Sequence, residues 1–108
     1  MGRADNRVKV LGELVDLEEI EHELSILADG GFLPGTFAVV AVPDERAGHA
    51  LVPVFAGSVD AECITAVLGA YAVHAPGFRR LRPAMRLEPF PRSPMGKPRR
   101  AEILAAIF

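Results

Sequence analysis

Cysteine, tryptophan and long apolar runs are scarce in this sequence, and each scarcity excludes a class of protein. The single cysteine, Cys63, permits neither a disulfide framework nor a cysteine-based zinc site. His22, His49 and His74 are scattered without the spacing of metal ligands. No apolar run reaches the ~18 residues of a membrane-spanning helix, and the N-terminus has no signal-peptide pattern. We therefore expect a protein of a reducing, cytoplasmic compartment, with no membrane partner.

The residues that are present suffice for one domain with its own core. The chain has 108 residues, of which 50% are hydrophobic. A chain near the most frequent domain length buries a core without disulfides or a structural metal. We therefore treat residues 1–108 as a single domain. It should consist of a hairpin at about 6–16, a sheet and helix core at about 17–90, and a loop with a terminal helix at about 91–108.

The net charge of −2 conceals two segments of opposite sign. Residues 13–29 contain seven acidic residues and no lysine or arginine, whereas residues 79–100 contain eight of the twelve lysines and arginines. A basic segment can meet the phosphates of a nucleotide or of nucleic acid. With six Phe, one Tyr and no Trp, the chain lacks the exposed aromatic residues that stack on single-stranded bases. We therefore do not expect a nucleic-acid partner.

Local patterns near the N-terminus predict a β-hairpin followed by a helix. Alternating valines before Gly12 predict a half-buried strand that ends in a turn. Asp16 and Glu19 have the spacing of a capping box, and Gly30-Gly31 predicts the end of the helix. The helix should bury one apolar stripe, which consists of Leu17, Ile20, Leu24 and Leu27. Its other acidic residues should lie on the surface: Glu18, Glu21 and Glu23.

The middle of the chain predicts three strands and a second helix. Residues 36–42 are nearly all apolar, which predicts a strand covered on both faces. Residues 50–56 predict an antiparallel partner, which Pro53 places at a sheet edge or at a bulge. A helix over residues 58–71, capped by Ser58 or Asp60, and a strand over residues 84–88 should follow. The side chains that we expect to face the core are Val67, Leu68, Tyr71, Met85 and Leu87. This order predicts an α+β fold, in which an N-terminal β-hairpin precedes a small mixed three-stranded sheet packed against about three helices.

A proline-rich segment before the C-terminal helix presents one lysine. Four prolines between positions 89 and 98 exclude a helix or a central strand there, and Gly96 permits a backbone bend. We therefore expect a defined, exposed loop with the Lys97 ammonium at its tip. The terminal helix should begin at about Arg99, with Pro98 suited to its first position. A lysine ammonium suits phosphate or carboxylate oxygens; the alternative is an ordinary solvated surface lysine.

Motifs at the two ends of the chain together resemble one family. Near the N-terminus, the pattern G-R-x-D…K…G…E-I-E is matched by Gly2-Arg3-Ala4-Asp5, Lys9, Gly12 and Glu19-Ile20-Glu21. Near the C-terminus, the pattern P-R-T-x-x-G-K…R is matched by Pro91-Arg92-Ser93-Pro94-Met95-Gly96-Lys97 and Arg100. In this order they resemble the C-terminal domain of the adenylate-forming superfamily: acyl-CoA synthetases, nonribosomal peptide adenylation domains and luciferases. The resemblance extends over nearly the whole chain.

The resemblance implies part of an ATP-dependent acid:CoA ligase. The family converts a small-molecule carboxylic acid and ATP to an acyl-adenylate and pyrophosphate, and then transfers the acyl group to a thiol. A large N-terminal adenylation domain, on the same chain or separate, is expected to hold the acid, ATP and Mg²⁺, so this chain should be inactive by itself. The acid stays open, as does the acceptor, which is coenzyme A or a carrier-protein thiol.

The same resemblance implies roles for individual residues. Lys97 would be the catalytic lysine of adenylation, between the substrate carboxylate and the α-phosphate. Asp5 would be the hinge about which the domain rotates between the two half-reactions. The residues implied to contact the nucleotide are Arg3 and Lys9, and those implied to line the thiol tunnel are Leu11, Gly12 and Glu13.

A second interpretation does not depend on the resemblance. The chain would be a stand-alone interaction module that uses the basic region between Arg79 and Arg100. Its partner would be a separate N-terminal domain, an acidic carrier protein or nucleic acid, and binding to nucleic acid would weaken steeply with salt.

Overall fold

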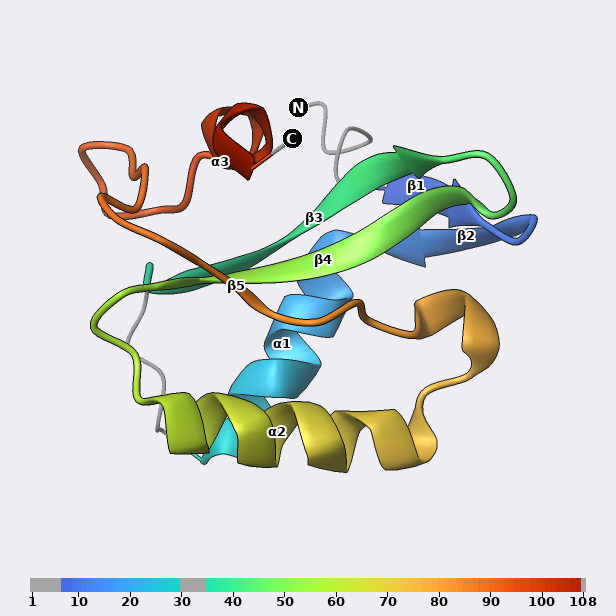
Figure 1. Cartoon of the computed structure of the whole chain (residues 1–108), viewed down its shortest axis with the longest axis horizontal. Helices are drawn as coiled ribbons and strands as arrows, with labels where there is room; N and C mark the ends of the chain where they lie inside the picture. Colours follow the sequence, from blue (N-terminus) through green and yellow to red (C-terminus); the bar gives the residue numbers. More distant parts are fainter. Residues whose placement is uncertain (1–6, 30–34, 108) are drawn as a thin grey trace.

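The computed structural model describes residues 7–29 and 35–107, which form two sheets and three α-helices (Figure 1). The elements are β1 (Arg7–Val10), β2 (Glu13–Asp16), α1 (Leu17–Ala28), β3 (Phe37–Asp44), β4 (Gly48–Ala56), α2 (Ala61–His74), the 3₁₀ turn η2 (Gly77–Arg79), β5 (Met85–Leu87) and α3 (Arg100–Ile107). Strands β1 and β2 form an antiparallel hairpin. The larger sheet has the order β3-β4-β5, in which β4 is antiparallel to β3 and parallel to β5. The predicted α+β fold with a mixed three-stranded sheet is confirmed.

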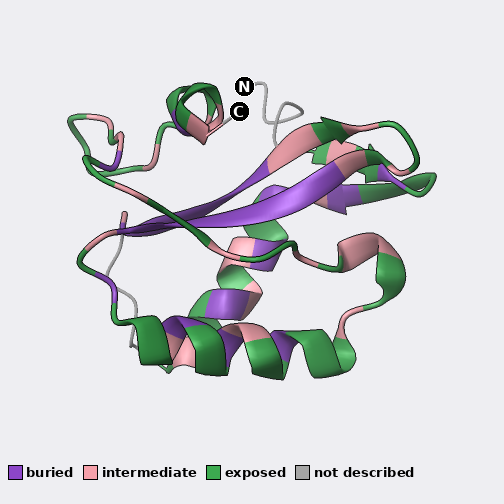
Figure 2. Ribbon diagram, viewed as in Figure 1, coloured by how far each residue is buried: buried purple, intermediate pink, exposed green. Residues whose placement is uncertain are grey.

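The core lies along β3 and β4, between two layers of helices. Helices α1 and α2 lie on one side of the larger sheet, and α3 lies on the other (Figure 1). Residues 37–40 of β3 and residues 50–56 of β4 are therefore buried, as the purple stretches of Figure 2 show. The prediction of an apolar strand covered on both faces is confirmed, because a helix packs on each face.

The position of Pro53 differs from the prediction. Pro53 lies on β4, which is the central strand of the sheet and not an edge. On one side Pro53 is opposite Val39; on the other, β5 pairs only with residues 54–56 and an isolated bridge joins Leu51 to Leu81. Pro53 thus falls in a gap of the parallel pairing. A central strand tolerates the proline because no partner strand requires its missing N–H there.

Helix α1 follows the prediction at its start and departs from it along one face. The Glu18 N–H donates to the Asp16 carboxylate (3.0 Å), which confirms the N-cap. The Glu19 carboxylate instead lies 3.3 Å from the guanidinium of Arg79. Three residues of the expected stripe are buried, but Leu27 is 41% exposed because it borders a groove between α1 and α2. The helix ends at Ala28, before Asp29 in a left-handed conformation; Gly30 and Gly31 lie outside the described residues.

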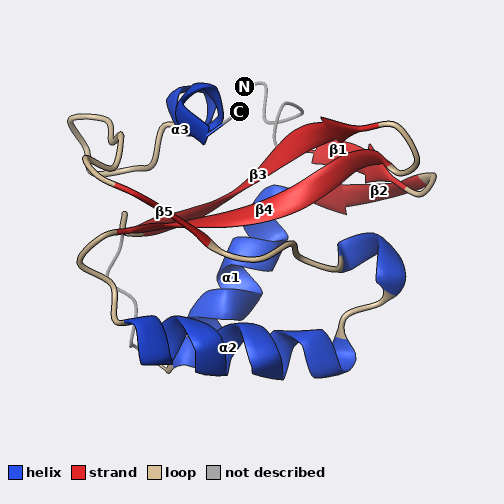
Figure 3. Ribbon diagram, viewed as in Figure 1, coloured by secondary structure: helices blue, strands red, loops and turns tan. Residues whose placement is uncertain are grey.

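The later elements match in type, with small shifts. Helix α2 begins after Asp60, whose carboxylate accepts the Glu62 N–H (3.4 Å), and Val67 and Tyr71 are buried as expected. Met85 is 40% exposed, contrary to the prediction, because the short β5 is an edge strand. Between β5 and α3 the chain is irregular (Figure 3).

Helix α3 begins one residue later than predicted. It starts at Arg100, and Pro98 pairs with Arg92 instead of opening the helix. In the described part of the chain, no helix is both long and apolar enough to span a membrane.

Candidate functional site

The segment of residues 91–98, hereafter the lysine loop, is a small hairpin with a defined turn. The Gly96 N–H donates to the carbonyl of Ser93 (2.8 Å), and the Ser93 N–H donates to the carbonyl of Lys97 (2.7 Å). Gly96 has a φ of +86°, which glycine adopts without strain. Ser, Pro and Gly at the first, second and fourth positions of such a turn are the residues that it favours. The predicted defined loop is confirmed, but its tip is formed by Pro94 and Met95, and Lys97 follows the turn opposite Ser93.

The side chain of Ser93 stabilises this turn. Its Oγ accepts the N–H groups of Met95 (3.3 Å) and Lys97 (3.3 Å). This role of Ser93 was not predicted from the sequence. The signal was available, because a serine directly before a proline commonly bonds to backbone groups further along a turn.

The base of the lysine loop is attached to the body of the domain. The Arg92 Nε donates to the carbonyl of Gly35, and the Arg92 guanidinium lies over the buried ring of Phe90, 5.5 Å from its centroid. A Cβ on Gly35 would lie 2.2 Å from the Gly96 carbonyl oxygen. The two glycine backbones are thus in direct contact, which fixes the loop against the segment that enters β3.

Lys97 itself projects from this attached loop. Its side chain is exposed, and it has no hydrogen-bond or ion-pair partner among the residues that the structure describes. The ammonium is therefore available to an external anion. The hydrogen bonds of the loop fix the position of the Lys97 backbone, whereas the four-carbon side chain keeps its rotamer freedom.

Glu21 and Arg100 lie close to the loop, and here the prediction for Glu21 is wrong. Glu21 was expected on the surface, but its side chain is only 18% exposed and forms an ion pair with Arg100. The Val39 N–H donates to the Glu21 carboxylate (2.7 Å). Burial raises the pKa of Glu21, although the nearby Arg100 and the Val39 N–H oppose this shift. The helical spacing of apolar residues alone cannot show that Arg100, from the other end of the chain, covers Glu21.

A second candidate region is the turn of the β1–β2 hairpin, Leu11-Gly12. The register pairs Val10 with Glu13, so the turn has two residues, and both have positive φ: 53° for Leu11 and 84° for Gly12. Such a turn favours Asn or Gly at its first position. Leu11 nevertheless occupies it and is 59% exposed. A strained, exposed apolar residue of this kind is a candidate for contact with a ligand or a partner.

The hairpin is fixed against the β3–β4 turn. The Leu11 N–H donates to the carbonyl of Ala47 (2.8 Å), and the His49 Nδ1 lies 3.2 Å from the carbonyl oxygen of Lys9. The Lys9 side chain is exposed, as is that of Glu13. The structure therefore groups Lys9, Leu11, Gly12 and Glu13 at one end of the domain.

The two candidate regions lie at opposite ends of the molecule. In Figure 1 the lysine loop is at the left and the hairpin turn is at the right. They therefore cannot act on one small ligand at the same time without a rearrangement. Arg3 and Asp5, the other two residues with expected roles, lie outside the described residues.

The basic region from Arg79 to Arg100 is mostly occupied by internal contacts. Arg82 pairs with Asp44 (3.3 Å), Arg99 pairs with Glu102 (2.9 Å), and Arg86 donates to the carbonyl of Gly57 (2.8 Å). Three further arginines have the partners already described: Arg79, Arg92 and Arg100. Among the described residues, only two of the eight cations have no side-chain partner, Arg80 and Lys97. A partner of the stand-alone interaction module would therefore have to compete with internal contacts for most of this basic region.

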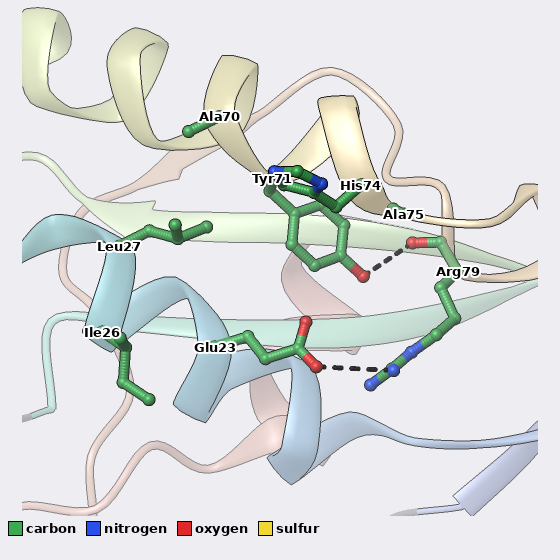
Figure 4. A pocket seen from close by; sticks show the side chains of 8 residues that line it. All are labelled: Glu23, Ile26, Leu27, Ala70, Tyr71, His74, Ala75 and Arg79. Carbon is green, nitrogen blue, oxygen red and sulfur yellow. Dashed lines mark hydrogen bonds and ion pairs between the residues drawn. The ribbon is translucent and has the colours of Figure 1, made fainter.

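A groove of about 300 Å³ between α1 and α2 was not predicted (Figure 4). Its apolar lining includes Ile26, Leu27 and Ala70. At its polar end the Tyr71 hydroxyl donates to the Arg79 carbonyl (2.8 Å), and the Arg79 guanidinium pairs with Glu23 (3.4 Å). The side chains of Tyr71, Glu23 and Arg79 thus already have partners within the groove, which His74 also lines. The described residues contain no cluster of His, Cys, Asp or Glu that could hold a metal ion.

The fold has counterparts of known structure, although no protein-family model and no curated protein matches the sequence. The chain is similar to an acyl-CoA synthetase (AMP-forming)/AMP-acid ligase II-like protein from Dyadobacter fermentans, with 16% identity over 100% of this chain and a TM-score of 0.81. It is similar to ATP-bound MatB from Rhodopseudomonas palustris, with 24% identity over 95% of the chain and a TM-score of 0.66. It is also similar to the amide bond synthetase McbA from Marinactinospora thermotolerans, with 21% identity over 98% of the chain and a TM-score of 0.71.

These similarities define the class of fold. The chain has a fold that occurs within AMP-forming acyl-CoA synthetases and related ligases. It spans 31%, 20% and 21% of the lengths of the three proteins named, so it corresponds to a part of each of them.

Proposed function

We propose that this chain is the mobile C-terminal domain of an ATP-dependent acid:thiol ligase that works through an acyl-adenylate. The observation that carries the proposal is Lys97, an exposed lysine whose side chain has no partner among the described residues, on a loop whose turn is held by backbone and Ser93 hydrogen bonds. The shared fold with AMP-forming ligases and the motifs at both ends of the chain support it. The partner is an N-terminal adenylation domain that holds ATP, Mg²⁺ and the acid.

In the first half-reaction, Lys97 would supply positive charge where negative charge moves. A carboxylate oxygen of the acid attacks the α-phosphorus of ATP, the bond between the α-phosphorus and the α,β-bridging oxygen breaks, and pyrophosphate leaves with that oxygen. An ammonium between the carboxylate and the α-phosphate stabilises the charge that develops on the phosphate oxygens. A fixed charge in a closed site contributes strongly, because it needs no reorganisation during the reaction.

In the second half-reaction, the opposite end of the domain would face the adenylate. Rotation about Asp5 would replace the lysine loop with the hairpin, so that Lys9 contacts the adenylate and Arg3 the nucleotide. Gly12 leaves room for a pantetheine arm beside Leu11 and Glu13, since a Cβ at Gly12 would meet nothing within 4 Å inside this domain. The separation of the two regions in Figure 1 supports this alternation.

The acceptor in the second step is a thiol in this proposal, that of coenzyme A or of a carrier protein. One of the proteins with the same fold is an amide bond synthetase. An amine is therefore the acceptor to test beside the thiols.

The test is Lys97→Ala in the enzyme assembled with its adenylation domain, with Arg80→Ala as the matched control for loss of one exposed cation. Lys97→Ala should lower adenylation, measured by pyrophosphate exchange, roughly 10²–10³-fold, as expected for loss of one electrostatic donor. Thioester formation from a preformed adenylate should continue, and Arg80→Ala should adenylate normally. Normal adenylation by Lys97→Ala would refute the proposal.

A further inference from the structure

Two motif residues that the proposed function leaves without a role, Glu21 and Arg100, meet at the edge of the larger sheet. The Arg100 Nε donates to the carbonyl of Val39 (3.1 Å), and its guanidinium pairs with the Glu21 carboxylate. The Glu21 carboxylate in turn accepts the Val39 N–H (2.7 Å). Both polar groups of one β3 residue are thus bound by two side chains that are also bound to each other. The three contacts join α1, β3 and α3.

The contacts among Glu21, Arg100 and Val39 are well suited to hold a segment of the chain in one position. The side chains of Glu21 and Arg100 are only 18% and 22% exposed, so water competes little for their hydrogen bonds. A guanidinium is planar and presents several donors in fixed directions, so it can bind a carboxylate and a carbonyl at once. Its orientation is therefore determined by two acceptors, whereas a lysine ammonium at the same place would be a single point charge.

The segment that these contacts hold in position is the lysine loop. Arg100 follows Lys97 by three residues, and the intervening Pro98 pairs with Arg92 across the base of the loop. The Arg99 N–H donates to the carbonyl of Pro91 (3.1 Å). The incoming arm of the loop is bound to the body through Arg92 and Gly35, and the outgoing arm is bound through Arg100.

We infer that Glu21 and Arg100 are a positioning pair for adenylation: together they fix the outgoing arm of the lysine loop on β3 and so set where the Lys97 ammonium lies. The inference rests on the proposed function of Lys97. It assigns no contact with the substrate to either residue. Because misplacing a reacting group by about 1 Å can cost 10²-fold in rate, a small relaxation of this pair should affect adenylation in particular.

The experiment compares two conservative variants, Arg100→Lys and Glu21→Gln, in the assembled enzyme. Each should lower the kcat of adenylation roughly 10-fold or more, with KM values for ATP and the acid nearly unchanged, because the catalytic charge is displaced and the binding sites are not. Thioester formation from a preformed adenylate should proceed at the rate of the unaltered enzyme. Arg99→Lys is the matched control, since the Arg99 side chain pairs with the exposed Glu102 on the same helix, and it should leave both half-reactions unchanged.

The readout separates a positioning role from a purely structural one. Equal loss of both half-reactions, or normal adenylation by Arg100→Lys, would overturn the inference. If either single variant fails to fold, the double variant Glu21→Gln/Arg100→Met removes both charges together and is judged by the same comparison. Lys97→Ala is run in parallel: if it adenylates normally, the proposed function has failed, whereas loss with Lys97→Ala but not with Arg100→Lys refutes only the positioning pair.

Discussion

Tyr71 is the only tyrosine of the chain, and its ionisation reports directly on the packing of α1 against α2. The residue is 4% exposed, and its hydroxyl donates to the carbonyl of Arg79 (2.8 Å). Burial raises the pKa of Tyr71 from 10.0 to about 12; the guanidinium of Arg79 opposes the shift and the carboxylate of Glu23 adds to it. We therefore predict that the folded protein keeps the phenolic proton well above pH 10.

The magnitude and the sign follow from the two pKa values. Between pH 10 and about 12 the unfolded chain loses this proton and the folded chain retains it. The free energy of unfolding should therefore fall as the pH rises through this range, by about 1.4 kcal/mol per pH unit. The difference between pKa values of 10.0 and about 12 corresponds to a total of roughly 3 kcal/mol in the free energy of unfolding. Below pH 10 both states hold the proton, so this contribution is complete there.

Two measurements test the raised pKa of Tyr71 and the resulting loss of stability at alkaline pH. The phenolate absorbance should titrate with a midpoint at about 12 in the folded protein and at about 10 in denaturant, and no tryptophan obscures the signal. Circular dichroism of the same samples establishes that the protein is still folded. Urea unfolding at several pH values should show that the variant Tyr71→Phe lacks the alkaline loss of stability, although it is less stable at pH 7 by about 1 kcal/mol for the lost hydrogen bond. A midpoint near 10 in folded protein would refute the buried hydroxyl.

Two further predictions concern the backbone of the candidate regions. Leu11→Asn should raise the free energy of unfolding by about 1 kcal/mol, because Asn-Gly suits a turn with two positive φ angles; an unchanged or lower urea midpoint would contradict the strained turn. Gly35→Ala should lower the free energy of unfolding by roughly 2–4 kcal/mol, because a Cβ at this positive φ also overlaps the Gly96 carbonyl. Gly12→Ala is the matched control, with positive φ but open space, and should cost only about 1 kcal/mol. Equal losses for the two alanine variants would show that Gly35 does not pack on the lysine loop.

The features that the sequence predicted correctly are those that neighbouring residues determine. The turn at Gly12, the cap at Asp16 and the bend at Gly96 each depend on a few adjacent positions, and the structure has all three. The exposure of Lys97 was predictable for the same reason, because a turn between prolines has no strand or helix in which to bury a side chain.

The features that the sequence did not predict depend on contacts between distant segments. Glu21 has the helical phase of a surface residue, and only the arrival of Arg100 at β3 makes its burial possible. Proline is typical of edge strands, and Pro53 can occupy the central strand only because the pairing with β5 has a gap beside it. In each case the local preference is outweighed by a partner whose position depends on the whole fold.

The arginines of the C-terminal segment compensate for what its prolines remove. Four prolines between positions 89 and 98 supply no backbone N–H, and residues 88–99 contain no strand that pairs with the sheet. Three arginines provide donors instead, each to a backbone carbonyl of an earlier segment: Arg86 to Gly57, Arg92 to Gly35 and Arg100 to Val39. A guanidinium can bind a carbonyl and still pair with a carboxylate. Three of the eight cations in this region therefore serve to attach an irregular segment to earlier parts of the chain, and Arg80 and Lys97 are the two that have no side-chain partner among the described residues.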